Sequence, residues 1–308
     1  MTVMHRSVLT RKVVEFLITN EDGIYVDATV GDGGHTLAIL EKFKSSKVIG
    51  IDIDKKALEK ARERLEFFGN RLKLVYGDYS DMERIIREDC EIDYVDGILF
   101  DLGIRLEMVT DKFRGFSFQK DGPLDMRFDR KATKTAYRVV NNYSEEMLKK
   151  IFRNNSDIKS AGKIARKIVN YRQMKPIETT TQLAEICAGD IPSRKRTDFL
   201  ARVFQAIRIE VNDEFQKLRD ALKNSIEILK SSGRIVIISY HSGEDRIVKN
   251  YFATESKDCI CPPGLPVCRC GHKRSIRILT KKAVRPDDEE IAQNPKARSA
   301  KLRAVEKL

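Results

Sequence analysis

The strongest constraint on the fold is a regular alternation of strand-like and helix-like segments between residues 24 and 101. Short apolar runs rich in Val and Ile alternate with longer runs whose apolar residues recur every three or four positions, which is the period of an α-helix. The expected strands cover residues 24–30, 47–53, 72–75 and 95–100, and the expected helices cover 36–43, 55–67 and 80–87. Such alternation predicts an α/β fold with a parallel, doubly wound sheet.

The alternation stops after Gly103, and no convincing buried strand follows before about Pro192. A loop rich in Gly, Phe and Asp and several helical patterns fill this stretch, so we interpret it as an inserted helical domain. Further helices are expected at 144–152, 161–171, 180–188, 197–211, 214–229 and 244–252, and further strands at 234–240 and 275–280. We expect residues 1–105 and 201–308 to form the core domain and residues 106–200 the insertion. The basic tail, residues 294–308, is expected to be only partly ordered.

Composition narrows the class of protein. Hydrophobic residues make up 41% and charged residues 34%, a balance typical of soluble globular domains. No run approaches the roughly 20 apolar residues of a membrane span, and the first residues, MTVMHRSV, hold no apolar signal segment. The net charge of +12 indicates a polyanionic partner, nucleic acid first, although a basic host proteome is the alternative. We expect a cytoplasmic protein without a membrane partner.

The turn after the first strand carries the clearest ligand signal. In VDATVGDGGH, residues 26–35, Gly31 and Gly33 lie between a strand and a helix, where glycine lets the backbone approach a ligand and the helix N-terminus offers N–H groups. Asp52 ends the next strand, where a carboxylate can accept hydrogen bonds from both ribose hydroxyls. These residues predict a cofactor that contains a nucleoside; a glycine turn without a ligand is the alternative.

Two cofactor classes fit this turn. The dinucleotide fingerprint G-x-G-x-x-G has Thr36 in its third glycine position here, and the carboxylates of Asp27 and Asp32 would repel a pyrophosphate. A cationic sulfonium suits these acids better, so we favour S-adenosylmethionine over a dinucleotide, which would instead indicate an oxidoreductase. Tyr79, which follows the third strand, can stack on an adenine ring or simply pack on the edge of the core.

Several further blocks are too unusual to be generic. They are FDLG at 100–103, RGFSF at 114–118, DGPLDMR at 121–127, FQAIR at 204–208 with VN at 211–212, SYHS at 239–242 with EDRIVK at 244–249, and NPKARS at 294–299. With them the chain resembles, from about His5 to Glu306, the bacterial small-subunit rRNA (cytidine-N4)-methyltransferase family, called RsmH or MraW. That family methylates N4 of a cytidine in 16S rRNA with S-adenosylmethionine.

The resemblance implies a fold and a partner. The fold would be a class I, Rossmann-like, S-adenosylmethionine-dependent methyltransferase domain with an inserted helical domain that helps to recognise the cytidine. The partner would be 16S rRNA within the small ribosomal subunit, and the oligomeric state, monomer or homodimer, stays open.

The resemblance also implies site residues. Those that would line the cofactor are Gly31, the amino-acid-end residues Gly33, Gly34 and His35, the ribose-binding Asp52, Tyr79 on the adenine side, and Asp101 near the methyl group. At the position of Met108 the family usually has a glutamine that contacts the cofactor, and a methionine cannot make the same hydrogen bond. Arg105 and Leu106 replace two small serines. A degenerate relative that binds rRNA or a pre-ribosomal particle without methyl transfer is therefore the alternative to an active enzyme.

The amine of cytosine is a weak nucleophile because its lone pair is delocalised into the ring. The Asp101 carboxylate, or a carbonyl beside it, is expected to accept an N–H hydrogen bond from this amine; capping the turn at Gly103 is the alternative. Asp125 and Arg127 are expected to form a wall of the cytidine pocket, or only to hold the shape of their loop. His241 is expected to bond the base or a phosphate, or to be a buried structural histidine.

The target base must leave its stack to reach such a site, so we expect single-stranded or loosened RNA as the substrate. The tail cations expected to contact phosphates, unless the tail is merely solvated, are Lys296, Arg298, Lys301 and Arg303. Four cysteines form C-x-C-x6-C-x-C from Cys259 to Cys270, whereas zinc sites favour C-x2-4-C spacing. We therefore expect no metal ion; a structural zinc is the alternative.

Overall fold

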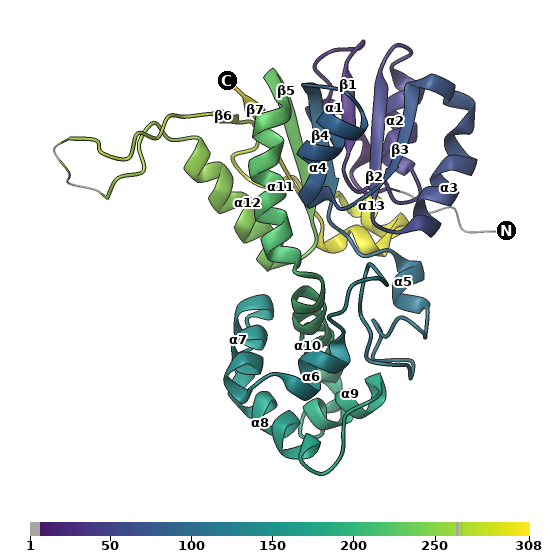
Figure 1. Cartoon of the computed structure of the whole chain (residues 1–308), viewed down its shortest axis with the longest axis vertical. Helices are drawn as coiled ribbons and strands as arrows, with labels where there is room; N and C mark the ends of the chain where they lie inside the picture. The colour runs from purple at the N-terminus through teal and green to yellow at the C-terminus, as the bar shows by residue number, and fades with distance from the viewer. Residues whose placement is uncertain (1–6, 263–264, 266) are drawn as a thin grey trace. The chain divides into compact units, whose positions relative to one another are not determined.

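The computed structural model describes residues 7–262, 265 and 267–308 (Figure 1); His5, where the resemblance begins, lies outside them. The chain divides into two compact units. The sheet unit contains the chain up to Gly103 and from Gln216 onward, and the helical unit contains Ile104–Phe215. The first division lies close to the expected boundary at 105, whereas the expected boundary at 200 lies inside one continuous helix, α10 (Ser193–Asn212).

The sheet unit is built on seven strands in the order β3-β2-β1-β4-β5-β7-β6. They are β1 (Ile24–Asp27), β2 (Lys47–Asp52), β3 (Leu72–Tyr76), β4 (Val95–Asp101), β5 (Leu229–Ser239), β6 (Ile276–Ile278) and β7 (Lys301–Lys307). β1 to β5 pair in parallel, and β7 runs antiparallel to β5 and β6. This confirms the expected Rossmann-like class I α/β fold, and it places the carboxyl ends of β1, β2 and β4 at one edge of the sheet.

Helices cover both faces of this sheet because the side chains of a strand point alternately to either face. Ile235 and Ile237 of β5 pack with residues of α4, α11 and α12, while Val236 and Ile238 pack with residues of α1 and α2. The helices of the sheet unit are α1 (Thr10–Leu17), α2 (Gly34–Lys42), α3 (Lys55–Leu65), α4 (Met82–Arg84), α11 (Glu214–Ile228, which begins just before the division), α12 (Ser242–Glu255) and α13 (Asp288–Gln293).

The prediction of a partly ordered tail is wrong. The tail forms a short 3-10 helix, η4 (Pro295–Ser299), and then β7, which lies between β5 and β6. Leu302, Ala304 and Val305 are fully buried on this strand. Lys301 and Arg303 pair with Asp245 of α12, at 3.3 and 2.7 Å. The basic composition suggested disorder, but pairing on both edges satisfies the backbone, and Asp245 offsets part of the charge of Lys301 and Arg303.

The helical unit, drawn mainly in teal in Figure 1, has a hydrophobic core of its own. Its helices are α5 (Leu106–Thr110), α6 (Ala136–Asn142), α7 (Glu145–Ser156), α8 (Ala161–Arg172), α9 (Thr180–Ala188) and α10 (Ser193–Asn212). The Ser144 hydroxyl caps α7, and Thr179 forms a capping box with Gln182 at the start of α9. The expected run of helices is thus present. In the described part of the chain, none of the helices is both long and apolar enough to cross a membrane.

Candidate active site

The glycine turn and Asp52 come together at the carboxyl ends of β1 and β2. The backbone N–H of Gly31 donates to Oδ2 of Asp52 at 2.9 Å, and the N–H of Asp54 donates to Oδ1 at 2.8 Å. The Asp52 carboxylate is therefore held in a fixed orientation by the backbone on both sides. The two motifs that the sequence analysis joined into one nucleoside signal do lie side by side.

The first turn of α2 has no side-chain cap, so its N–H groups are available to a ligand. Gly33 precedes the helix in the left-handed region, at φ 79°, and makes no side-chain cap. A Cβ at this residue would lie 2.6 Å from Cδ1 of Leu65, so glycine is required both for its conformation and for its packing against α3. A helix that begins without a side-chain cap presents a partly positive end suited to a carboxylate.

Tyr79 begins the short 3-10 helix η2 (Tyr79–Asp81), which is separated from the end of β3 by two residues. Its ring is half-buried and meets the ring of Phe100 edge to face, with centroids 5.9 Å apart. The preceding Asp78 pairs with Lys217 of α11 at 2.7 Å. The ring thus packs on the edge of the core, and its role toward an adenine stays a prediction.

A network of ionisable side chains lies at the carboxyl ends of β1, β4 and β5. Oδ1 of Asp101 accepts the hydroxyl of Tyr240 at 2.8 Å, and Oδ2 lies 3.3 Å from Nε2 of His35. His35, predicted to line the amino-acid end of a cofactor, turns its buried imidazole toward Asp101. Asp27, which is 1% exposed, accepts the hydroxyl of Thr36 at 2.8 Å. Thr36 occupies the third glycine position of the dinucleotide fingerprint, and its hydroxyl donates a hydrogen bond to this buried carboxylate.

Burial and the neighbouring charges shift the pKa values of the groups in this network. Burial by itself would lower the pKa of His35, but the carboxylates of Asp101 and Asp27 outweigh it and raise the pKa above its usual value. Burial also raises the pKa of Asp27, an effect that His35 only partly offsets. Burial, followed by the charge of Asp101, raises the pKa of Tyr240. Tyr240 therefore stays protonated and donates to Asp101 throughout the physiological range.

In this network Asp101, like Tyr240, is partly open to solvent. Its side chain is 22% exposed, whereas that of His35 is 5% exposed. Its backbone N–H donates to the hydroxyl of Thr29 at 2.7 Å, and a Cβ at Gly103 would lie 2.9 Å from the Tyr240 ring. The Tyr240 hydroxyl therefore holds the carboxylate beside His35, and Thr29 fixes the backbone of Asp101, while part of the carboxylate still faces outward.

Sequence reasoning missed Tyr240 and Thr29 as parts of the site. Tyr240 directly follows β5, the neighbour of β4, and Thr29 lies two residues after the end of the neighbouring β1. Polar residues just beyond the carboxyl ends of adjacent parallel strands meet at one edge of the sheet, and that signal could have found both.

His241 is the N-cap residue of α12. The N–H of Glu244 donates to its Nδ1 at 3.4 Å, and its Nε2 lies 3.0 Å from a carboxylate oxygen of Glu244. The other Glu244 oxygen accepts the N–H of Tyr240 at 2.9 Å and that of His241 at 3.3 Å. This capping box gives His241 a structural role, and its contact with a base or phosphate stays a prediction.

Asp125 and Arg127 form a bidentate ion pair inside one loop of the helical unit. Oδ1 of Asp125 accepts Nε of Arg127 at 2.9 Å, and Oδ2 accepts the guanidinium at 2.6 Å. The same guanidinium donates to the carbonyls of Arg130 and Ala132 at 2.8 and 2.7 Å. These bonds hold the loop in shape, which is one of the two predicted roles; the cytidine-pocket role stays a prediction.

Asn212 of α10 holds this loop from the other side. Its Nδ2 donates to the carbonyl of Met126 at 2.8 Å, and its Oδ1 accepts the N–H of Phe128 at 2.7 Å. The DGPLDMR and VN blocks are thus two halves of one contact, although they are far apart in the sequence.

Replacing Asn212 with alanine should destabilise the helical unit by about 2–4 kcal/mol, because it leaves two backbone groups of the loop without a partner. Asn155→Ala is the matched control, since Asn155 makes a single bond to the carbonyl of Ala206 at 3.1 Å. The chain has no tryptophan, so urea unfolding is followed by circular dichroism, with amide exchange reporting on residues 123–129. Equal effects of the two substitutions would contradict the role given to Asn212.

Met108 lies on α5 and is buried in the core of the helical unit. It packs in the same cluster as Leu124, Met126 and Phe204. This explains why an apolar side chain is accommodated at a position where the family usually has glutamine, and its contact with a cofactor stays a prediction.

Comparison with known proteins identifies close relatives. A family model described as the MraW methylase family matches residues 2–308. The protein named ribosomal RNA small subunit methyltransferase H of Caldicellulosiruptor bescii is 47% identical over 306 residues, which cover 99% of this chain and 99% of that protein. Proteins of the same name from Caldicellulosiruptor saccharolyticus and Syntrophotalea carbinolica are each 46% identical over 99% of this chain, and over 99% and 98% of their own lengths.

Proposed function

Because this chain belongs to the MraW methylase family, we propose that it transfers a methyl group from S-adenosylmethionine to N4 of one cytidine in 16S rRNA. The observation that carries the proposal is the match along nearly the whole chain to proteins named ribosomal RNA small subunit methyltransferase H. The partly exposed carboxylate at the end of β4 supports it, since methylation of an amine needs an acceptor for the N–H proton.

The residues of the glycine turn fit S-adenosylmethionine. The uncapped first turn of α2, from Gly34, suits the carboxylate of the amino-acid end. Asp52 is oriented by backbone donors, and because a carboxylate oxygen accepts more than one hydrogen bond, it can also bind both ribose hydroxyls. We assign Gly31, Gly33, Gly34 and Asp52 to the cofactor on these grounds, with the half-buried Tyr79 beside the adenine.

When bound, S-adenosylmethionine would supply an electrophilic methyl group on a sulfonium, with neutral S-adenosylhomocysteine as the leaving group that keeps the electron pair of the broken S–CH3 bond. Asp101 accepts one N–H bond from the cytosine amine, which draws the nitrogen lone pair out of conjugation with the ring. The nitrogen becomes more acidic as it forms its bond to carbon, and the Asp101 carboxylate takes the proton that must leave. The carboxylate thus acts first as an orienting acceptor and then as the base.

Tyr240 and His35 act through Asp101 and are positioning residues. The Tyr240 hydroxyl fixes Oδ1, and the imidazole of His35 lies beside Oδ2. Asp101 ends β4, Tyr240 follows β5 and His35 lies in α2, so these elements of the sheet unit fix all three side chains. Asp101 therefore needs little rearrangement to meet the amine.

The substrate is proposed to be rRNA within the small ribosomal subunit, in the cytoplasm, with its target base unstacked. Of the four tail cations, Lys301 and Arg303 are engaged by Asp245, while Lys296 and Arg298 are exposed. Phosphate contact is therefore assigned to Lys296 and Arg298.

The alternative hypothesis, a degenerate relative that only binds rRNA, was based on the altered residues 103–109. Met108 of this run packs in the helical core, while Asp52 and Asp101 keep ordered partners at the sheet edge. These observations favour an active enzyme.

The test is transfer of a labelled methyl group from S-adenosylmethionine to small subunits that lack the modification, followed by nucleoside analysis of the rRNA. N4-methylcytidine should appear at one position, and subunits that already carry the modification should accept no label. Label in another nucleoside would overturn the assignment of the base. Cofactor binding without transfer to any subunit or naked rRNA would restore the degenerate alternative.

A further inference from the structure

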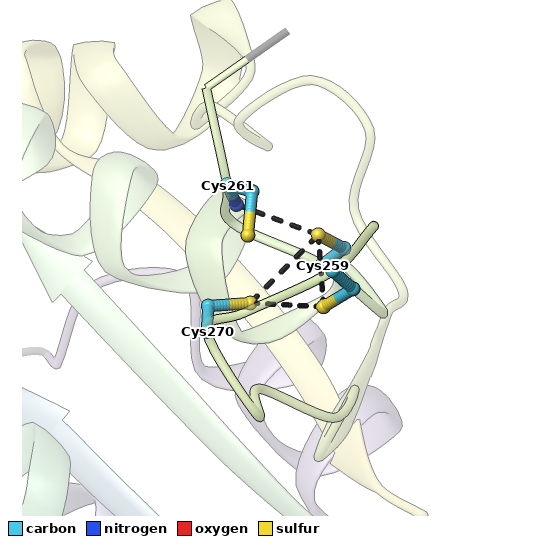
Figure 2. A group of neighbouring side chains, drawn as sticks. Cys259, Cys261 and Cys270 are labelled. Carbon is cyan, nitrogen blue, oxygen red and sulfur yellow. Dashed lines mark hydrogen bonds between the residues drawn. The ribbon is translucent and has the colours of Figure 1, made fainter. Parts of the chain in front are cut away.

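The segment between α12 and β6, residues 256–275, brings four thiols together. The Sγ atom of Cys259 lies 3.5 Å from that of Cys268 and 3.7 Å from that of Cys270, and the last two lie 3.5 Å apart. Cys261 completes the group, with all four sulfur atoms within 4.8 Å of one another. Figure 2 shows the side chains of Cys259, Cys261 and Cys270 gathered around one point.

These separations are those of ligands around one ion. Four sulfur atoms placed about 2.3 Å from a tetrahedral zinc ion lie about 3.8 Å from each other, whereas the sulfur atoms of a disulfide are about 2.05 Å apart. All four cysteines are free thiols. Three sulfur–sulfur distances of 3.5–3.7 Å therefore match three edges of a metal-sized tetrahedron and match no disulfide.

Backbone N–H groups point at the same sulfur atoms. Ile260 donates to Cys270 and Cys261 donates to Cys259, each at 3.4 Å, and Arg269 donates to Cys261 at 3.3 Å. Such outer hydrogen bonds stabilise thiolates and orient metal ligands. The nearby His272 is engaged elsewhere, with Nε2 3.1 Å from the carbonyl of Thr254, so the donor set is four sulfur atoms.

The described residues of this segment form no hydrophobic core that could hold the arrangement. None of the described residues between 256 and 275 is buried, and its larger apolar side chains, Ile260, Leu265 and Val267, are 47%, 48% and 69% exposed. Segments that cannot bury apolar surface need a covalent or metal cross-link to keep one conformation. Persistent disulfides are rare in a reducing compartment, which leaves a metal ion.

We propose that Cys259, Cys261, Cys268 and Cys270 bind one structural Zn²⁺ ion that closes this segment. Four thiolates in a tetrahedron are the donor set that zinc prefers, and a site filled entirely by protein ligands leaves no position for catalysis. The C-x-C spacing argued against zinc because it is shorter than the usual one. The fold overrides that argument by bringing two C-x-C pairs face to face.

The experiment uses the full-length chain without a histidine tag, purified under reducing conditions. Metal analysis by mass spectrometry should find about one zinc ion per chain. Cobalt exchanged into the site should show sulfur-to-cobalt charge transfer and the strong d–d bands of a tetrahedral centre. Removing zinc with a chelator should increase amide exchange within residues 257–275 and leave α9 unchanged.

The variants Cys259→Ser and Cys270→Ser should each lose the zinc and the cobalt signal, with an affinity loss beyond the roughly 10- to 100-fold typical of an outer-shell change. Cys90→Ser is the matched control, because Cys90 is a half-buried thiol outside the cluster, and it should keep both signals. Circular dichroism verifies that every variant is folded. The proposal is overturned if zinc does not bind the reduced protein, if it binds the cluster variants equally, if the bound metal is iron, or if protein purified without oxygen contains disulfides here. None of these measurements depends on methyl transfer, so they test the zinc site independently of the proposed function.

Discussion

Replacing Asp101 with asparagine is expected to lower kcat for methyl transfer by about 10²–10⁴-fold. The amide keeps the shape of the side chain and can still accept the Tyr240 hydroxyl, which lies 2.8 Å from Oδ1. It cannot take the proton that leaves the cytosine amine. Single-turnover transfer to unmodified small subunits measures the chemical step, and calorimetry with S-adenosylmethionine measures cofactor affinity separately.

Tyr240→Phe is the control for this result. It removes the hydroxyl that orients Asp101 but keeps the ring packed against Gly103, so it should lower kcat by less than Asp101→Asn does. If Asp101→Asn fails to fold beside the buried His35, Asp101→Glu keeps the charge and tests its placement. Full activity of a folded Asp101→Asn variant would discard the carboxylate as acceptor and leave a neighbouring backbone carbonyl in that role.

Replacing Asp52 with asparagine should weaken binding of S-adenosylmethionine by about 10²–10⁴-fold. Two hydrogen bonds to a charged acceptor contribute about 1.5–3 kcal/mol each, and about 1.4 kcal/mol corresponds to a factor of ten in Kd. An amide can also accept only one of the N–H groups of Gly31 and Asp54, since its nitrogen is a donor. Calorimetric titration with S-adenosylhomocysteine, which does not turn over, gives the Kd directly.

Asp54→Asn is the matched control for Asp52. Asp54 caps α3 by accepting the N–H of Lys56 at 3.0 Å, and asparagine caps a helix about as well as aspartate, so this variant should leave both the stability of the helix and the cofactor affinity nearly unchanged. A 2′-deoxy analogue of S-adenosylhomocysteine completes a double-mutant cycle. Asp52→Asn should weaken the analogue less than the parent compound, and an equal loss for both would show that Asp52 does not bind the ribose.

Most of the sheet unit could be predicted because its signals are local. The apolar runs that form β1, β2, β3 and β4 are each only a few residues long. In the helices between them, apolar residues recur every three or four positions. The contact between Gly31 and Asp52 was also predictable, because Gly31 follows β1 and Asp52 ends β2, and these parallel strands end at the same edge of the sheet. The basic tail was misjudged since its composition, taken alone, does not reveal that β5 and β6 lie on either side of β7.

The sequence by itself determined the fold class, the glycine turn beside Asp52 and the family. Those features can be recognised from the spacing of apolar residues over a few positions and from contiguous blocks of residues. Only the tertiary structure decided that Tyr240 holds Asp101, a residue 139 positions away, that Asn212 holds the loop around Met126, and that four cysteines with an unusual spacing converge on one point. A hydrogen bond or a shared ligand depends on positions in space to within a fraction of an ångström. For Asp101 and for the loop around Met126, those positions are set by the packing of elements that are distant in the chain. For the cysteines they are set by the path of the backbone between the two C-x-C pairs, which the spacing alone does not specify.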